Sequence, residues 1–306
     1  MFLRYFSVVV IAAFATMGSA VAGQRAWVSG LGTDSVSCGA PASPCRTFQY
    51  AHDHIVSAGG SIYVKDSANY GQLTISKSIA FINDNGAMAL VEAGLGVGVT
   101  VEYSGVVLLK GLVIDGNGSG VTGIASTNSG SLTIANCTIQ GFTGAGVSII
   151  PNGGGNVVIS DSVIANNGTG IYTSGDSAGS LSVSLSRDQI VNNGYGATGF
   201  GVRVTGGSAA YQFTTIENSH ISQNGTGLSV EANGSNTVQA SLFDVTVVDN
   251  TKSINVAGGG SVRLERTAVQ AAFPTSITNG GSIVSFGDNA ITDSVTGAAI
   301  TTTPLK

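Results

Sequence analysis

The feature that most limits the fold of this chain is a phrase that recurs about every 25 residues. Residues 156–173 read NVVISDSVIANNGTGIYT, and residues 213–230 read FTTIENSHISQNGTGLSV. The apolar residues that anchor the successive copies are Leu109, Ile134, Ile159, Leu185, Ile216, Leu242 and Leu264. The gaps between them are 25, 25, 26, 31, 26 and 22 residues. A period of this length that drifts by a few residues is typical of a solenoid, in which each copy packs on its neighbours.

Each copy has the pattern of short strands joined by turns. Apolar residues alternate with polar ones, glycine and asparagine separate the alternating runs, and no helical apolar stripe occurs after residue 60. The leucine-rich-repeat pattern is absent, and a propeller blade needs about 40 residues. We therefore predict an all-β fold, a single-stranded parallel β-helix with rungs of about 25 residues and a short N-terminal capping helix.

Residues at equal offsets in successive rungs are expected to stack about 4.8 Å apart. One such column is expected to be core, and it contains Ile114, Ile139, Ile164, Ile190, Ile221, Val247 and Val269. A second column is rich in asparagine, and it contains Asn117, Phe142, Asn167, Asn193, Asn224 and Asn250. Asparagine tolerates left-handed backbone, and stacked amides hydrogen-bond along a ladder. We interpret the repeated phrase mainly as a scaffold.

The ladder segments LTIANCTIQGF, VVISDSVIANNGTGI and FTTIENSHISQNGTGL resemble the right-handed parallel β-helix superfamily, which includes pectate-lyase-like proteins. The front segment WVSGLGTDSVSCGAPASPCRTFQYAHD is similar to the entry segment of small exported bacterial β-helix repeat proteins. This resemblance covers about residues 26–300 and implies a right-handed coil. It does not imply one activity, because the fold hosts lyases, hydrolases, epimerases, adhesins and tail fibres.

The N-terminus has the three-part form of a secretory signal. Arg4 precedes a short apolar run, which ends before Ala20-Val21-Ala22. The alternative is a membrane anchor, but the run is shorter than the ~20 residues that span a bilayer. We predict a signal peptide at residues 1–22, a secreted or periplasmic location, and no membrane span after cleavage.

Residues 23–60 are predicted to form an N-terminal cap, followed by the β-helix over residues 61–306. In an exported protein, Cys38 and Cys45 are expected to close a loop as a disulfide. A zinc half-site is the alternative, but no second Cys or His pair has a suitable spacing. Cys137 has no evident partner and is expected to be a buried thiol.

Within the cap, residues 47–57 are expected to form an amphipathic helix that covers the end of the solenoid, with Phe48, Ala51 and Ile55 on one face. The helix contains His52-Asp53-His54. Residues two apart on a helix point about 200° away from each other, so the two imidazoles are not expected to chelate one metal ion.

Charge limits the partners. The net charge is −5, only 9% of residues are charged, and no basic run occurs. These values argue against nucleic acid as a partner. A surface of amides and hydroxyls suits a polysaccharide or cell-surface glycan, and end-to-end or lateral self-association is also left open.

The catalytic motifs of related folds are missing. Pectin hydrolases of this superfamily carry N-x-D, D-D, G-H-G and R-x-K motifs, and uronate epimerases carry D-P-H, but none of these occurs. No cofactor is predicted, and Ca²⁺ is left open without a motif to support it, because the acidic residues are scattered over the rungs. Whether the protein is an enzyme is left undecided, with a polysaccharide lyase as the enzymatic option.

Two columns carry charge. The turn column contains Gly111, Asn136, Asp161, Arg187, Asn218, Asp244 and Arg266. We interpret Asp161 with Arg187, and Asp244 with Arg266, as ion pairs between rungs. The next column, with inward parity, contains Leu112, Cys137, Ser162, Asp188, Ser219, Val245 and Thr267. Asp188 would then be buried with Ser162 and Ser219 as donors, unless the long 31-residue rung bulges and turns it outward.

The same long rung carries the insertion GYGATGFG, and aromatic and charged residues gather around it in the sequence. The candidate catalytic residues are Asp188, Arg187, Arg203 and His220. The candidate ligand-binding residues are Tyr195, Phe200 and Glu217. Aromatic rings can hold a sugar, and the charged groups could abstract a proton next to a uronate carboxyl group.

Three functions follow as hypotheses. The first is an exported β-helix protein that binds polysaccharide without an evident catalytic motif. The second is a polysaccharide lyase or uronate epimerase that acts on an acidic glycan. The third is a structural or adhesive module.

Overall fold

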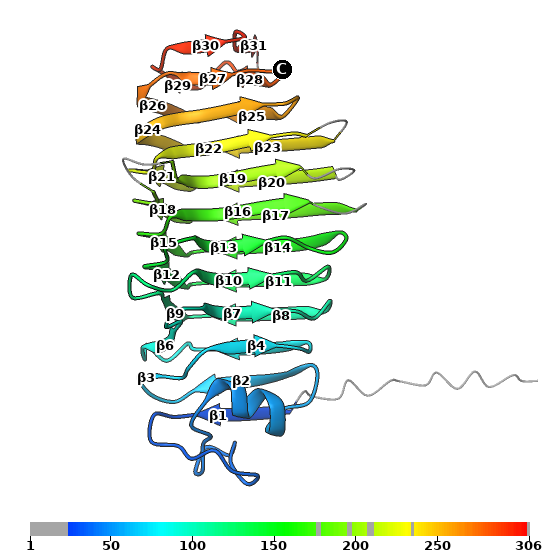
Figure 1. Cartoon of the computed structure of the whole chain (residues 1–306), viewed down its shortest axis with the longest axis vertical. Coiled ribbons are helices and arrows are strands. Elements are labelled where there is room, and N and C mark those ends of the chain that lie inside the picture. Colours follow the sequence, from blue (N-terminus) through cyan, green and yellow to red (C-terminus); the bar gives the residue numbers. More distant parts are fainter. Residues whose placement is uncertain (1–23, 176–178, 195–197, 207–210, 234–235, 305–306) are drawn as a thin grey trace, which may run out of the picture.

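Alternating apolar residues build stacked ladders of parallel strands that wind around one axis (Figure 1). The computed structural model describes residues 24–175, 179–194, 198–206, 211–233 and 236–304. The predicted all-β parallel β-helix with a short helix near the N-terminus is confirmed. The predicted signal peptide, residues 1–22, lies outside the described residues.

The first sheet has 12 strands and forms one side of the solenoid. Its strands, in spatial order, are β1 (Arg25–Val28), β2 (Gly60–Val64), β5 (Ile79–Ile82), β8 (Val106–Lys110), β11 (Ser131–Ala135), β14 (Gly155–Ser160), β17 (Ser180–Ser186), β20 (Tyr211–Glu217), β23 (Thr237–Phe243), β25 (Ser261–Glu265), β28 (Ser282–Phe286) and β31 (Thr301–Thr303). Because β1 already pairs with β2, the sheet begins inside the segment that was predicted as the cap.

Two further ladders complete each rung. The short-strand ladder contains β3 (Ala68–Asn69), β6 (Ala89–Glu92), β9 (Leu112–Asp115), β12 (Thr138–Gln140), β15 (Val163–Ala165), β18 (Gln189–Val191), β21 (His220–Ser222), the start of β24 (Thr246–Ala257), β26 (Ala268–Phe273) and β29 (Ala290–Ile291). The long-strand ladder contains β4 (Leu73–Ile75), β7 (Val97–Val101), β10 (Thr122–Ser126), β13 (Ala145–Ile149), β16 (Thr169–Gly175), β19 (Phe200–Gly206), β22 (Thr226–Glu231), the end of β24, β27 (Thr275–Ile277) and β30 (Val295–Gly297). Since β24 runs through the corner, the two ladders join as one 19-stranded sheet.

The predicted core column lies inside the solenoid. All seven members, from Ile114 to Val269, are at most 1% exposed. Cys137 is also buried and free, and burial raises the pKa of its thiol to about 11. These inward side chains are apolar on every rung, so the repeat stabilises the fold mainly by removing apolar surface from water.

The asparagine column forms a buried hydrogen-bonded ladder. The side-chain oxygen of Asn193 accepts both the backbone N–H (3.1 Å) and the amide group (3.0 Å) of Asn167. Asn224 and Asn250 repeat this pattern on the next rungs. Each of these amides also donates to a main-chain carbonyl of the preceding rung, for example Asn193 to Ile164 (3.0 Å). The ladder therefore leaves no buried amide unpaired at these positions.

One part of the interpretation of this column was wrong. The backbone is not left-handed at the ladder residues, which are Asn167, Asn193, Asn224 and Asn250. The left-handed conformation is adopted instead by the residue that precedes each of them. Asn166, Asn192, Gln223 and Asp249 have φ between 55° and 58°. Asn117 is itself left-handed (φ 49°) and exposed, and it does not join the ladder. A side chain that must point into the corner needs the preceding backbone unit to turn it there.

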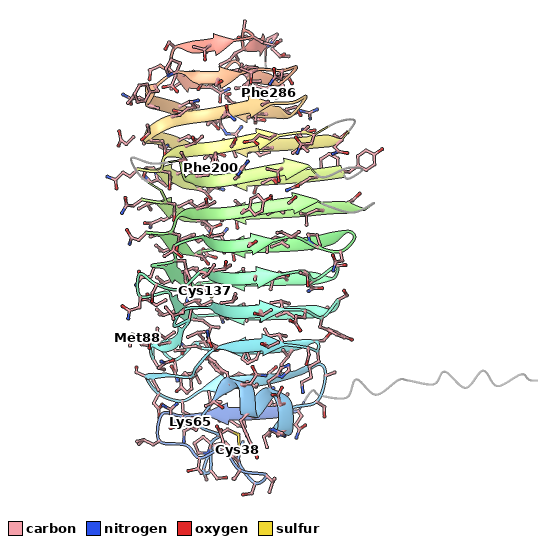
Figure 2. The ribbon with its side chains drawn as sticks, in the orientation of Figure 1. Cys38, Lys65, Met88, Cys137, Phe200 and Phe286 are labelled. Atoms are coloured by element: carbon pink, nitrogen blue, oxygen red, sulfur yellow. A yellow bond between two sulfur atoms is a disulfide. The ribbon has the colours of Figure 1, made fainter. Side chains whose placement is uncertain are left out.

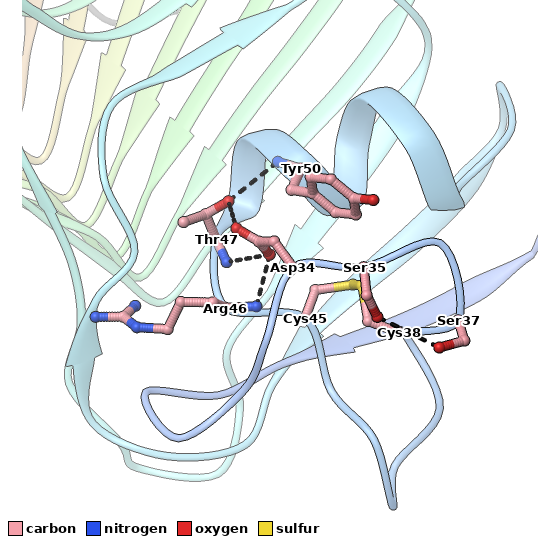
Figure 3. The surroundings of a disulfide bond; sticks show 8 residues. All are labelled: Asp34, Ser35, Ser37, Cys38, Cys45, Arg46, Thr47 and Tyr50. Atoms are coloured by element: carbon pink, nitrogen blue, oxygen red, sulfur yellow. Dashed lines mark hydrogen bonds between the residues drawn. A yellow bond between two sulfur atoms is a disulfide. The ribbon is translucent and has the colours of Figure 1, made fainter.

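The N-terminal cap is held by a disulfide and by a capped helical turn (Figure 3). Cys38 and Cys45 are bonded, as predicted. The Asp34 carboxylate accepts the main-chain N–H groups of Arg46 (2.7 Å) and Thr47 (3.1 Å) and the Thr47 hydroxyl (2.8 Å). Thr47 in turn caps the helix by accepting from the Tyr50 N–H (3.1 Å).

The expected helix over residues 47–57 is shorter and not a regular α-helix. It consists of α1 (Phe48–Tyr50) and a π-helical turn, η1 (Ala51–Ile55), which ends where the Val56 N–H donates to the Ala51 carbonyl. Phe48 and Ala51 are fully buried, while Ile55 is only partly buried. The turn thus presents the expected apolar face to the end of the solenoid.

The two histidines of this turn point to different neighbours. His52 is buried, its Nδ1 lies 2.6 Å from Asp53, and its Nε2 accepts the Ser76 N–H (3.3 Å). Burial lowers the pKa of His52 below its usual value. His54 instead packs its ring on Tyr50, with the ring centres 4.5 Å apart.

No helix within the described residues is long and apolar enough to cross a bilayer.

Candidate functional site

Each rung turns from the first sheet into the short-strand ladder through one left-handed residue. The turn column has positive φ at Gly111 (72°), Asn136 (54°), Asp161 (54°), Arg187 (57°), Asn218 (49°), Asp244 (55°) and Arg266 (47°). Glycine, asparagine and aspartate adopt this conformation readily, whereas arginine does so rarely. The geometry aims every side chain of the column outward from the same corner.

The two ion pairs predicted in this column are confirmed. Arg187 donates from Nε (2.6 Å) and from its terminal nitrogen (2.8 Å) to the two carboxylate oxygens of Asp161. Arg266 holds Asp244 in the same two-pronged way (2.8 and 3.0 Å) and also contacts Glu265. These hydrogen bonds hold the pKa of the Asp161 and Asp244 carboxyl groups below the usual value. Both guanidinium groups are therefore occupied by the protein itself.

Asp188 faces inward, not outward on a bulge. It is 1% exposed, and its two carboxylate oxygens accept the main-chain N–H groups of Ser162 (2.9 Å) and Ser186 (3.0 Å). Burial raises the pKa of its carboxyl group to about 7, although these two hydrogen bonds work in the opposite direction. The carboxylate takes the position that a serine hydroxyl holds on adjacent rungs.

The expected donors to Asp188 were wrong in detail. The hydroxyl of Ser162 donates to the Ser160 carbonyl (2.8 Å), and the hydroxyl of Ser219 donates to the Glu217 carbonyl (2.8 Å) and accepts the Asp188 N–H (3.1 Å). The N–H groups of Ser162 and Asp188, each of which follows a left-handed residue, point along the solenoid axis and donate to the column side chain on the next rung.

A shallow open hollow of about 580 Å³ lies outside this corner, and we call it the corner hollow. It is lined by Arg187, Asp188, Gln189, Asn218, Ser219, His220, Asp244 and Thr246. His220 is exposed on β21, between Gln189 and Thr246 of the adjacent strands. Its ring makes no hydrogen bond within the described part of the chain. The hollow thus offers one free imidazole beside Arg187, Asp188 and Asp244, whose side chains already have partners in the protein.

The outward side of β20 continues from this corner along the first sheet, and we call it the β20 face. It consists of Tyr211, Phe213, Thr215 and Glu217. Tyr211 is 56% exposed and Phe213 is 44% exposed. The paired residues on the two adjacent strands are small or polar at these rings, namely Ser180 and Thr237 beside Tyr211, and Ser182 and Gln239 beside Phe213. Two aromatic rings therefore project about 7 Å apart from a surface of hydroxyls and amides.

Tyr211 and Phe213 were missed from the sequence, although a signal for them was present. Residues 211–217 read YQFTTIE, and Ile216 is an inward anchor of the repeat. Counting back in steps of two from Ile216 places Thr214 and Gln212 inside, and Tyr211 and Phe213 outside.

The sequence-predicted candidates do not form one cluster. Arg187, Asp188, Glu217 and His220 meet at the corner hollow and the adjoining end of β20. Phe200, which is labelled in Figure 2, lies instead on β19 in the long-strand ladder. Arg203 lies on the same strand. Tyr195 lies outside the described residues. The reason is that a rung changes direction at each corner, so residues about 15 apart in the chain face different sides.

Arg203 is held in place by its own neighbours. Its guanidinium lies 4.8 Å from the ring centre of Phe200 and 5.9 Å from that of Tyr172, and it pairs with Glu231 (3.1 Å). Glu231 also accepts the Ser229 hydroxyl (2.7 Å). Such stacking and pairing orient an arginine without any ligand.

The chemistry open to these groups is limited. Asp188 is buried with both oxygens bonded to main-chain N–H groups, so it cannot reach a bound sugar as a base. In the described residues, one group of side chains has metal-ligand spacing, Asp34 with Cys38 and Cys45, but the two sulfurs are bonded to each other. The exposed aromatic rings, hydroxyls and amides of the β20 face are suited to binding.

The strand ladders and the corner define a right-handed parallel β-helix protein. The family model described as the right handed beta helix region matches residues 52–243, more than half of the chain, and the chain belongs to this family. No curated protein matches the chain in sequence.

Solved structures share the fold. The chain is similar to a pectate lyase, with a TM-score of 0.59 and 15% identity over 90% of this chain and 78% of that chain. It is also similar to an alginate lyase from Paenibacillus sp., with a TM-score of 0.51 and 14% identity over 90% of this chain and 99% of that chain. These identities show a common fold and no more.

Proposed function

We propose that this protein is exported and binds a polysaccharide on the outer side of its first sheet, without catalysing a reaction there. The observation that carries the proposal is the exposure of Tyr211 and Phe213 on one strand, amid serine, threonine and glutamine side chains. Exposed aromatic rings on a rigid strand offer flat apolar surface to a sugar ring, and the surrounding hydroxyls and amides can hydrogen-bond to it.

Three other observations support the proposal. The two fold neighbours are named for action on polysaccharides, a pectate lyase and an alginate lyase. The sequence predicts a signal peptide at residues 1–22, and the Cys38–Cys45 disulfide is typical of oxidising compartments. A secreted or periplasmic location would bring the β20 face to extracellular or cell-surface glycans.

Affinity gel electrophoresis of the mature chain, from Gly23 onward, tests the proposal. The gels contain neutral or acidic polysaccharides, and the retention of the protein by each polymer is measured. For a polymer that retains the wild type, the variant Tyr211→Ala/Phe213→Ala should bind about tenfold or more weakly, because exposed aromatic anchors commonly dominate binding. Phe273→Ala is the matched control, since Phe273 is 58% exposed on β26 of a different ladder. Retention that is equal in all three proteins would contradict the proposed site.

A polysaccharide lyase or uronate epimerase is the second candidate, and it is favoured by the fold neighbours alone. Its only free titratable group in the described corner hollow is His220. Ultraviolet absorbance for new double bonds, after incubation with pectins and alginates with and without Ca²⁺, tests lyase activity. An increase in absorbance with the wild type that is absent with His220→Ala would show that the protein is a lyase and would overturn the binding proposal.

A further inference from the structure

The N-terminal end of the first sheet presents a second set of aromatic side chains, far from the β20 face. Strands β1, β2, β5 and β8 project outward Arg25, Trp27, Ser61, Tyr63, Ala80, Ile82, Val106, Leu108 and Lys110. This surface carries two cations and no carboxylate among those residues. Its charge is opposite to the net charge of −5 of the whole chain.

Trp27 and Tyr63 form a stacked pair on this surface. They are direct partners in the β1–β2 register, with ring centres 5.7 Å apart and planes inclined by 25°. Both rings are partly exposed. The guanidinium of Arg25 lies 5.9 Å from the Tyr63 ring centre, on the same side of the sheet. Tyr63, Ile82 and Lys110 follow one another across β2, β5 and β8.

The two cations of this surface are free. Within the described part of the chain, neither Arg25 nor Lys110 forms an ion pair or a side-chain hydrogen bond. The three arginines near the sequence-predicted site are all paired, Arg187 with Asp161, Arg203 with Glu231 and Arg266 with Asp244. Neither cation would have to leave an ion pair or a side-chain hydrogen bond within the described residues to contact a ligand.

We propose that Arg25, Trp27, Tyr63 and Lys110 form a binding site for an acidic saccharide. The aromatic pair lies against a sugar ring, and the two cations pair with carboxylates of the same chain of sugars. Trp27 and Lys110 are three strand spacings apart, about 14 Å, which is the reach of an oligosaccharide. Lys110, the member of this site nearest to the β20 face, is four strand spacings from β20, about 19 Å, so the two sites are separate.

Trp27 is the only tryptophan of the chain and therefore reports on this site alone. We would titrate the mature chain with oligogalacturonate and follow tryptophan emission, with a cello-oligosaccharide of equal length as the neutral probe. The expected result is a saturable change with oligogalacturonate only. The affinity should fall as sodium chloride is raised, because salt screens exposed charges.

Substitutions divide the site into its parts. Arg25→Gln and Lys110→Gln should each weaken oligogalacturonate binding roughly two- to fivefold, as expected for exposed charge pairs. Tyr63→Ala should weaken it about tenfold or more. Lys252→Gln is the matched control, because Lys252 lies in β24 of the long-strand ladder. Thermal unfolding of each variant establishes that it is folded.

The inference is overturned if Trp27 emission does not change, if the cello-oligosaccharide has the same effect, or if Lys252→Gln weakens binding as much as Lys110→Gln. These outcomes are separate from those for the β20 face. Polymer retention that depends on Tyr211 and Phe213 while Trp27 stays silent would overturn only the acidic site. A Trp27 response that persists in Tyr211→Ala/Phe213→Ala would support the acidic site whether or not the β20 face binds.

Discussion

Asp188→Asn should change how the stability of this protein depends on pH. Burial raises the pKa of the Asp188 carboxyl group to about 7, against 3.8 for the ordinary group. The folded protein therefore keeps this proton over a range in which the unfolded chain releases it. The stabilising contribution is fully present below pH 3.8 and is lost as the pH rises through 7. A difference of about three pKa units corresponds to about 4 kcal/mol of unfolding free energy.

The asparagine side chain is neutral at every pH, and its one oxygen can accept only one of the two main-chain N–H groups that Asp188 accepts. The lost hydrogen bond lowers the stability of the variant by an amount that does not depend on pH, and relative to the wild type the variant should gain up to about 4 kcal/mol of unfolding free energy between pH 4 and pH 8. Urea unfolding followed by circular dichroism between these two values measures the difference.

The matched control is Asp244→Asn at the exposed corner. Its pKa is lowered by Arg266, so the charged form is the favoured one in the folded state. That variant should be less stable than the wild type by a nearly constant amount from pH 4 to pH 8, because the contribution of Asp244 is lost only as the pH falls below 3.8. A stability difference for Asp188→Asn that stays constant from pH 4 to pH 8 would refute the reasoning.

Two further predictions concern the scaffold. Asn193→Ala removes the acceptor of two donors on Asn167 and leaves other ladder groups unpaired, so it should lower the unfolding free energy, measured in urea, by about 3 kcal/mol or more. The control Asn156→Ala, on the exposed side of β14, should change the unfolding free energy by less than about 0.5 kcal/mol. Equal effects of the two substitutions would contradict the ladder argument. The double variant Cys38→Ser/Cys45→Ser should lower the unfolding free energy by about 2.5 kcal/mol, which is the loop-closure value for so short a loop. A melting temperature equal to that of the oxidised wild type would show that the cap does not need the disulfide.

Much of the interior could be read from the repeat. Once Ile159 and Ile216 were aligned, parity placed Ile164 inside and Asp161 at a turn, and both placements are correct. The cross-rung pair of Asp161 with Arg187 followed from equal offsets in the two rungs. These predictions succeeded because stacked parallel strands keep one register from rung to rung.

The candidate site was less predictable. Arg203 and Phe200 stood near Asp188 in the sequence, but β19 runs on another side of the solenoid from β18. Tyr211 and Phe213 were readable by parity, whereas the pairing of Trp27 with Tyr63 was not, because β1 lies outside the repeat and its register is set by the cap. Proximity in the chain is a poor guide in a fold where spatial neighbours are about one rung apart.

The sequence by itself determined the class of fold, the buried columns and the corner ion pairs, since each depends on the period and on local alternation, and it indicated the disulfide from the two nearby cysteines of a chain with a predicted export signal. Only the tertiary structure decided which outward side chains share a side of the solenoid and which cations remain unpaired. The physical reason is that alternation sets inside against outside within each strand, while the direction of each strand depends on how the corners turn.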